Sequence, residues 1–182
     1  HVRDGRAPAV YQNPAEFFER TFLTKNLSEL AAQVVRRLSG VKVETSAIFN
    51  LSTQFGGGKT HSLTLLFHLA QNGEAAKSWK GVSCILQNAG VSTVPKAATA
   101  IFVGTEFDSI SGRGGNDGTP LRKTPWGEIA FQLGGEEGFK LVEQHEEELT
   151  APGGDVIERM LPKGKPTLIL FDELMNYVSR SR

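Results

Sequence analysis

The sequence predicts a mixed α/β fold in which a parallel sheet is flanked by helices. Three apolar runs, at residues 47–51, 98–107 and 167–171, have the length and composition of buried strands. Segments with apolar residues at helical spacing lie before, between and after them. Because neighbouring parallel strands are joined by helical crossovers, this alternation predicts a parallel sheet with helices packed on it.

A glycine-rich loop separates the first apolar run from a helical pattern. The loop and the residue after it are Gln54, Phe55, Gly56, Gly57, Gly58, Lys59, Thr60 and His61. Glycines let backbone N–H groups close around phosphate oxygens, and a helix that begins at Lys59 points its positive dipole end at them. We expect Lys59 to reach the β- and γ-phosphates and Thr60 to ligate Mg²⁺. This arrangement predicts a fold of the P-loop NTPase type with ATP and Mg²⁺ as ligands.

The loop departs from the usual pattern at one position. Thr53 stands where the pattern places a glycine, five positions before Gly58. The alternative interpretation is a flexible glycine turn between a strand and a helix. It does not explain why Lys59 and Thr60 follow the glycines directly.

Two acids, Asp172 and Glu173, end the third apolar run. In open α/β sheets, ligands bind beyond the carboxyl ends of the strands. We therefore expect Asp172 to join the Mg²⁺ shell through a bound water, and Glu173 to act as the general base that polarises the attacking water. A core strand with a solvated acidic end is the alternative for this motif taken alone. Found together and in this order, the two motifs indicate a nucleotide-binding site far more specifically than either motif alone.

Composition narrows the class of protein. The 182 residues carry 20 Lys plus Arg and 20 Asp plus Glu, and this zero net charge argues against a strongly basic nucleic-acid surface. The single Cys84 lies in an apolar run, where we expect a small buried side chain, and one unpaired cysteine fits a reducing cytoplasm. No apolar run approaches the roughly 20 residues that span a bilayer, and no signal-peptide pattern opens the chain. We therefore expect a cytoplasmic protein without membrane contact.

The predicted organisation is a loose lead-in at residues 1–12 and a partial P-loop core at 13–182. Within the core, 13–40 form N-terminal helices capped at Asn13 and Asn26, and 41–182 form the nucleotide-binding part. Phe17, Phe18 and Phe22 should give the first helix an apolar face. Further helices are predicted at 59–71, 74–86, 124–133, 136–149 and 155–161, and from 174 onward.

Several other polar residues have two interpretations. His61 and His68 share a helix face but lack Cys or carboxylate partners, so packing is favoured over a metal site. Glu106 could join a Mg²⁺ or water network at the end of the second run. The acidic run 146–148 is expected to be a solvated face. Residues 108–124 are expected to form a long, mobile polar loop, whose basic residues could alternatively touch a nucleic acid or a partner subunit: Arg113, Arg122 and Lys123.

The glycine loop and the helix after it, residues 54–63 and 67–70, resemble a family of large prokaryotic AAA+-like ATPases, long catalogued as a domain of unknown function. Residues 13–18, 37–40 and 171–177 fit the same family, so the resemblance spans nearly the whole chain. Such ATPases are similar to those of anti-phage and DNA-modification gene clusters. The resemblance implies a multi-protein defence machine, with self-association or other subunits as partners and nucleic acid contacts only in the full-length protein.

Members of that family are much longer, which implies that the chain is an N-terminal fragment. In AAA+-like sheets, a strand with a polar sensor lies between the acidic strand and the nucleotide strand, and an arginine finger and a helical lid follow. Only nine residues follow Glu173, so the resemblance implies the phosphate half of a site without the parts that complete hydrolysis. Arg180 and Arg182 are candidate fingers, although exposed helix arginines are common.

The leading functional expectation is ATP binding, with Mg²⁺-dependent hydrolysis in the full-length protein and weak or no activity in this fragment. A nucleotide-binding scaffold without turnover is the alternative, because Thr53 replaces a glycine and the sensor elements are missing. A small-molecule kinase is a third interpretation, but it would not need Glu173 beside Asp172. ATP is expected over GTP because no Asn-Lys-x-Asp motif is present.

Overall fold

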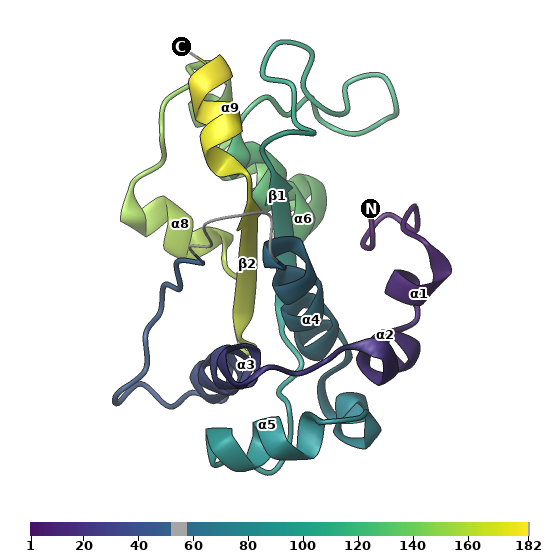
Figure 1. Ribbon diagram of the computed structural model, residues 1–182. Helices are drawn as coiled ribbons and strands as arrows, with labels where there is room; N and C mark the ends of the chain where they lie inside the picture. The colour runs from purple at the N-terminus through teal and green to yellow at the C-terminus, as the bar shows by residue number, and fades with distance from the viewer. Residues whose placement is uncertain (52–57, 182) are drawn as a thin grey trace. The chain divides into compact units, whose positions relative to one another are not determined.

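The computed structural model describes residues 1–51 and 58–181, which form two compact units, His1–Ala97 and Ala98–Arg182. Helices make up the first unit, and the second combines helices with a two-stranded parallel sheet (Figure 1). The predicted mixed α/β class is therefore confirmed. In the part of the chain that is described, no helix is both long and apolar enough to cross a membrane.

Capped helices open the first unit. After the short α1 (Ala9–Gln12), α2 (Pro14–Arg20) begins behind Asn13, whose side chain accepts a hydrogen bond from the Glu16 N–H as predicted. The longer α3 (Lys25–Leu38) is capped by Thr24, two residues before the predicted cap Asn26. These caps satisfy N–H groups that the first helical turn leaves free.

Three further helices complete this unit, and their positions agree with the prediction. They are α4 (Lys59–Asn72), the 3₁₀-helix η1 (Gly73–Ser78) and α5 (Val82–Ala89). Helices α2–α5 supply most of the apolar core of this unit. Its largest fully buried side chains are Phe17, Phe18, Val35, Leu65, Leu69, Val82, Ile85 and Val94.

Two predictions about side chains in this unit are wrong. Phe22 is 84% exposed because α2 ends at Arg20, and the chain beyond it no longer follows helical spacing. Cys84 is exposed because α5 buries its opposite side. The buried side of α5 consists of Val82, Ile85, Leu86 and Ala89.

The first predicted strand, at residues 47–51, is not a strand in this structure. The Thr45 hydroxyl donates to the Val41 carbonyl, and the Ser46 hydroxyl both donates to the Ile48 carbonyl and accepts from the Ile48 N–H. Such local side-chain bonds offer the backbone an alternative to a strand ladder. Ile48 is 84% exposed, so the apolar run is not buried as a core strand would be.

The other two predicted strands pair in parallel in the second unit. β1 (Ala98–Val103) and β2 (Thr167–Asp172) are in register from Ala98–Thr167 to Val103–Asp172. β1 is shorter than the predicted run 98–107 because the chain turns away after Gly104. On the other edge of β1, the Gln132 side chain accepts from the Ile101 N–H at 2.7 Å and donates to the Ile101 carbonyl at 2.8 Å. Gln132 thus occupies the place of a neighbouring strand.

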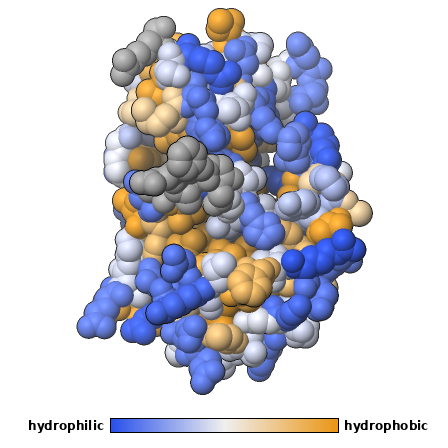
Figure 2. Space-filling model, in the orientation of Figure 1, coloured by the Kyte–Doolittle hydropathy of each residue, from blue (hydrophilic) through white to orange (hydrophobic). Residues whose placement is uncertain are grey.

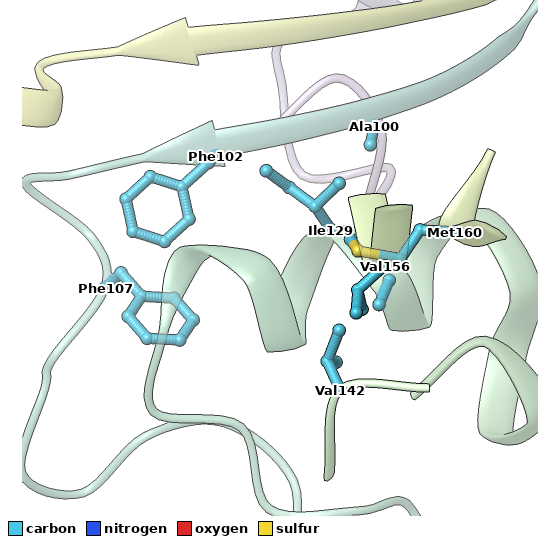
Figure 3. Packing of buried hydrophobic residues seen from close by; sticks show 8 residues of the cluster. Ala100, Phe102, Phe107, Ile129, Val142, Val156 and Met160 are labelled. Atoms are coloured by element: carbon cyan, nitrogen blue, oxygen red, sulfur yellow. The ribbon is translucent and has the colours of Figure 1, made fainter. Parts of the chain in front are cut away.

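Helices cover one face of this sheet around a single apolar cluster. They are α6 (Pro125–Lys140), α7 (Glu143–Glu147), α8 (Gly154–Met160) and α9 (Leu174–Arg180), and α6 is interrupted by the positive φ of Gly135, where a break was predicted. Figure 3 shows Phe102 and Phe107 side by side, with Ile129, Val156 and Met160 gathered on the same side of β1. Apolar side chains also reach the surface, and the face drawn in Figure 2 mixes hydrophobic with hydrophilic residues.

Residues 108–124 form the predicted long loop, but Arg122 is not solvated. Arg113 and Arg122 exchange two backbone hydrogen bonds of 2.8 Å, which fold the loop into a hairpin. The buried Arg122 donates from Nε to Glu128 at 2.8 Å, and its guanidinium carbon lies 4.0 Å from the Phe131 ring centroid. Arg122 therefore anchors the loop to α6.

The acidic run 146–148 is not a uniformly solvated face. Glu146 is 6% exposed, and its carboxylate accepts hydrogen bonds from the Lys123 and Thr124 N–H groups and from the Thr124 hydroxyl. Glu147 and Glu148 are exposed, as predicted. One carboxylate thus fixes the residues that lead into α6, which the charge pattern does not reveal.

This contact predicts a large difference between two neighbouring glutamates. Glu146→Ala leaves three donors, two of them buried, without an acceptor and should lower the free energy of unfolding by about 2–4 kcal/mol. The matched control, Glu147→Ala, removes an exposed carboxylate and should change it by less than about 0.5 kcal/mol. Urea unfolding followed by circular dichroism measures both values. If both variants changed the free energy of unfolding by the same small amount, the buried Glu146 carboxylate would contribute little to stability.

Candidate functional site

The first group of predicted site residues lies at the N-terminal turn of α4. Gly58 precedes the helix in the left-handed region, with φ of 81°, which side-chain-bearing residues rarely adopt. Lys59 and Thr60 are the first two helical residues, and Gly58 in the N-cap position has no side chain to cap this turn. The Ser62 and Thr64 hydroxyls each donate back along the helix at 2.8 Å. The other predicted loop residues, Gln54, Phe55, Gly56 and Gly57, lie outside the described residues.

His61, also predicted to contact the nucleotide, packs against α2. Its ring centroid lies 4.5 Å from that of Phe17, and its Nε2 lies 3.0 Å from Thr21 Oγ1. Because the Thr21 hydroxyl already donates to the Phe17 carbonyl at 2.7 Å, it accepts from His61 Nε2–H. Burial lowers the pKa of His61. The ring is therefore oriented by packing, and its contact with a nucleotide stays a prediction.

His68, about two turns after His61 on the same face of α4, is a packing residue, as expected. It is buried, and its Nε2 donates to the Tyr11 carbonyl at 2.8 Å. Burial lowers the pKa of His68, and the bond to Tyr11 partly opposes that effect. Among the residues with described positions, no three His, Cys, Asp or Glu side chains gather as a metal-binding group.

The second group of predicted site residues lies where β2 ends. Asp172 is the last residue of the strand and pairs with Val103 at the carboxyl end of β1. Glu173 follows in the left-handed conformation, with φ of 53°, which is rare for a residue with a side chain. Its carboxylate accepts a hydrogen bond of 2.5 Å from Asn176 Nδ2, in the first turn of α9. Lys59 and Thr60 belong to the first unit, whereas Asp172 and Glu173 belong to the second.

A close backbone contact holds this strand end in place. The Gly104 N–H donates to the Asp172 carbonyl at 2.8 Å, and a Cβ at Gly104 would overlap the Glu173 carbonyl oxygen. The absence of a side chain at Gly104 therefore permits the turn that carries Glu173.

Arg180, considered from sequence as an arginine finger, is engaged within the second unit. Its guanidinium donates to the Gly104 and Phe107 carbonyls, the latter at 3.2 Å, and its Nε donates to the Asn176 carbonyl at 3.0 Å. These bonds fasten α9 to the turn that follows β1. The other candidate, Arg182, lies outside the described residues.

A group of charges lies between the turn after β1 and α6. Arg113 is 3.6 Å from Glu128 and 4.0 Å from Glu106, while Arg122 and Gln132 both donate to the buried Glu128. The pairing of Glu106 with Arg113 does not exclude its predicted Mg²⁺ role, which stays a prediction.

Sequence reasoning missed Glu128 and Asn176. Asn176 follows Glu173 by three residues and Gln132 follows Glu128 by four, which are spacings at which side chains on one helix face meet. The contact of Glu128 with Arg122 crosses from a loop to a helix and has no such signal.

The comparisons with known proteins give one match. The model of a family described as the DUF499 N-terminal domain matches residues 1–182, so the chain belongs to this family. Neither the curated proteins nor the solved structures contain a match.

The contact at Gly104 predicts that adding one methyl group lowers the stability of the fold at this glycine but not at an uncrowded one. Gly104→Ala drives a Cβ into the Glu173 carbonyl and should destabilise the chain by about 1–3 kcal/mol. The matched control is Gly134→Ala in α6, where a Cβ would meet nothing within 4 Å. It should be neutral or stabilise by up to about 1 kcal/mol. Chemical denaturation measures both, and indistinguishable values would contradict the contact.

Proposed function

We propose that this member of the DUF499 family binds ATP and Mg²⁺ through the glycine loop and the first turn of α4. The observation that carries the proposal is the order Gly58, Lys59, Thr60 at the start of a 14-residue helix, with Gly58 in the left-handed conformation. The N–H groups of a first helical turn and the positive end of the helix dipole favour a bound phosphate at such a turn. A structural glycine turn would require neither a lysine nor a threonine at these positions.

The side chains present suit a magnesium nucleotide. In the proposed complex, Lys59 neutralises phosphate oxygens, Thr60 supplies an oxygen ligand to the metal, and Asp172 holds the metal through a bound water. A Mg²⁺ ion held by phosphates and water needs only one or two protein ligands, so a dedicated cluster of acids is unnecessary. When bound, Mg²⁺ neutralises the charge that develops on the phosphates.

The placement of the two acids supports a fold of the P-loop NTPase type. Asp172 and Glu173 follow a strand of a parallel sheet at its carboxyl end, where ligands of open α/β folds bind. We propose that Glu173 accepts a proton from the water that attacks the γ-phosphate. Gly104 fixes the backbone from which the Glu173 side chain projects.

A nucleotide-binding scaffold without turnover is the second candidate. The observation that favours it is the 2.5 Å hydrogen bond from Asn176 to the Glu173 carboxylate, which occupies one of the oxygens that a base would use. The ATPase and the scaffold share the same phosphate contacts. They differ only in whether the Glu173 carboxylate leaves Asn176 and accepts a hydrogen bond from the attacking water.

The resemblance to ATPases of anti-phage and DNA-modification clusters extends the proposal to a biological setting. In that setting, a longer cytoplasmic protein completes hydrolysis and couples it to a conformational or remodelling step within a multi-subunit assembly.

ATP binding predicts a lysine-dependent thermal shift. Ligand at one hundred times its dissociation constant stabilises a folded protein by about 2.7 kcal/mol, so saturating Mg²⁺-ATP should raise the melting temperature by several degrees. Lys59→Ala should abolish this shift, while the exposed control Lys77→Ala should retain it. An unchanged melting temperature of the unaltered chain at millimolar nucleotide would refute the proposal.

Turnover predicts a separation of binding from chemistry at Glu173. Glu173→Gln keeps the size of the side chain but cannot accept a proton, so ATP affinity should persist while hydrolysis falls by about 10²–10⁴-fold. A single-turnover assay on the longest available protein, with fluorescent-nucleotide binding in parallel, measures both quantities. Binding without hydrolysis in the unaltered protein would favour the scaffold, and equal loss of both in the variant would contradict the assigned base.

A further inference from the structure

Two histidines of α4 hold α2 in the first unit. His61 and His68 are seven residues apart and share a helix face, and His61 belongs to the first turn. His68 donates to the carbonyl of Tyr11, three residues before α2, at 2.8 Å. At the other end of α2, His61 Nε2 lies 3.0 Å from the hydroxyl of the C-cap residue Thr21. The Phe17 ring packs against both imidazoles, at centroid distances of 4.5 and 5.3 Å. Helix α2 is thus attached to α4 at both ends and through its middle (Figure 1).

Thr21 makes the attachment that lies nearest to the start of α4. Its hydroxyl has one proton, which it donates to the Phe17 carbonyl at 2.7 Å, so its lone pair accepts from His61. Thr21 is 7% exposed, and water therefore competes little for this bond. The bond fixes the His61 side chain from outside its own helix.

The first turn of α4 is the element that both Thr21 and a phosphate would restrain. The Ser62 N–H donates to the Gly58 carbonyl at 2.8 Å, and residues 59–61 precede that bond. Helix ends fray because the first N–H groups lack intrahelical acceptors, and a bound phosphate orders such a turn by accepting from them. Through His61, the contact with Thr21 orders the same turn before a phosphate arrives.

We propose that Thr21 is a positioning residue for the nucleotide, acting through His61 on the first turn of α4. The inference rests on the ATP binding proposed for this turn. Because two restraints on one turn share the cost of ordering it, the Thr21 bond tightens ATP binding, and bound ATP in turn tightens the attachment of α2. The net contribution of one hydrogen bond corresponds to about a two- to tenfold change in affinity.

Isosteric variants test the effect on affinity. Thr21→Val removes the hydroxyl, keeps the shape and should raise the dissociation constant of Mg²⁺-ATP about two- to tenfold, whereas Thr21→Ser should keep it within about twofold. The matched control is Thr45→Val, because the Thr45 hydroxyl also donates to the carbonyl four residues before it. This control should leave the constant unchanged. Titration with a fluorescent nucleotide measures all four proteins, and unaltered affinity in Thr21→Val would overturn the proposal.

Hydrogen exchange separates positioning from a merely structural role. Saturating Mg²⁺-ATP should slow exchange of the amides of residues 18–21 in the unaltered chain. Thr21→Val should lose this protection even at a nucleotide concentration that saturates it. Exchange that ignores ATP in the unaltered chain, or protection that persists in the variant, would contradict the coupling.

A double variant distinguishes positioning from direct contact of His61 with the nucleotide. His61→Phe keeps an aromatic ring against Phe17 but removes the N–H donor, so it also serves as the test if Thr21→Val fails to fold. Since the two changes remove one bond, the double variant should bind ATP no more weakly than the weaker single variant. Additive losses would show that His61 acts on the nucleotide itself and would overturn the role of Thr21.

The outcome for Lys59 separates this proposal from the nucleotide proposal. If the unaltered chain shows no thermal shift that depends on Lys59, both proposals fall. If the shift is present and Thr21→Val binds ATP as tightly as the unaltered chain, only the positioning role falls.

Discussion

The close approach of Gly104 to the end of β2 is the constraint on which the proposed catalytic end of the second unit depends. The Gly104 N–H extends the ladder by one bond to the Asp172 carbonyl, and its missing side chain leaves room for the Glu173 carbonyl. A residue such as Glu173 adopts the left-handed conformation at a cost of about 1 kcal/mol or more, and it persists only where neighbours over-determine it. Arg180 provides a second restraint, since it fastens α9 to the same turn. The carboxylate therefore projects from a backbone that has little freedom.

Two buried carboxylates organise the rest of this unit. Glu146 gathers the N–H groups that lead into α6, and Glu128 receives Arg122 and Gln132. A buried charge is tolerated when hydrogen bonds or an opposite charge replace its hydration. Glu128 has both, and Glu146 accepts three hydrogen bonds. Through Gln132, the same network reaches the edge of β1. The long hairpin, the first turn of α6 and the sheet edge are thus linked by polar contacts in addition to the apolar packing of α6 on β1.

The local signals in the sequence predicted much of this fold. The Asn13 cap, the glycine break in α6 and the apolar runs of β1 and β2 each depend on residues a few positions apart, so they can be predicted directly from the sequence. The failures are of another kind. The run 47–51 has the composition of a strand, yet a strand exists only where a partner supplies hydrogen bonds, and composition does not report the partner. Similarly, the charge run 146–148 gives no sign that Glu146 meets Thr124, since that contact joins residues 22 positions apart.

The same long-range dependence limits what could be predicted of the site. Gly58, Lys59 and Thr60 form a continuous motif, so their place at the start of α4 followed from the sequence. The engagement of Arg180 with Gly104 joins residues 76 positions apart and could not be foreseen. A finger arginine and a structural arginine look alike in sequence, and only the acceptors around the guanidinium separate them.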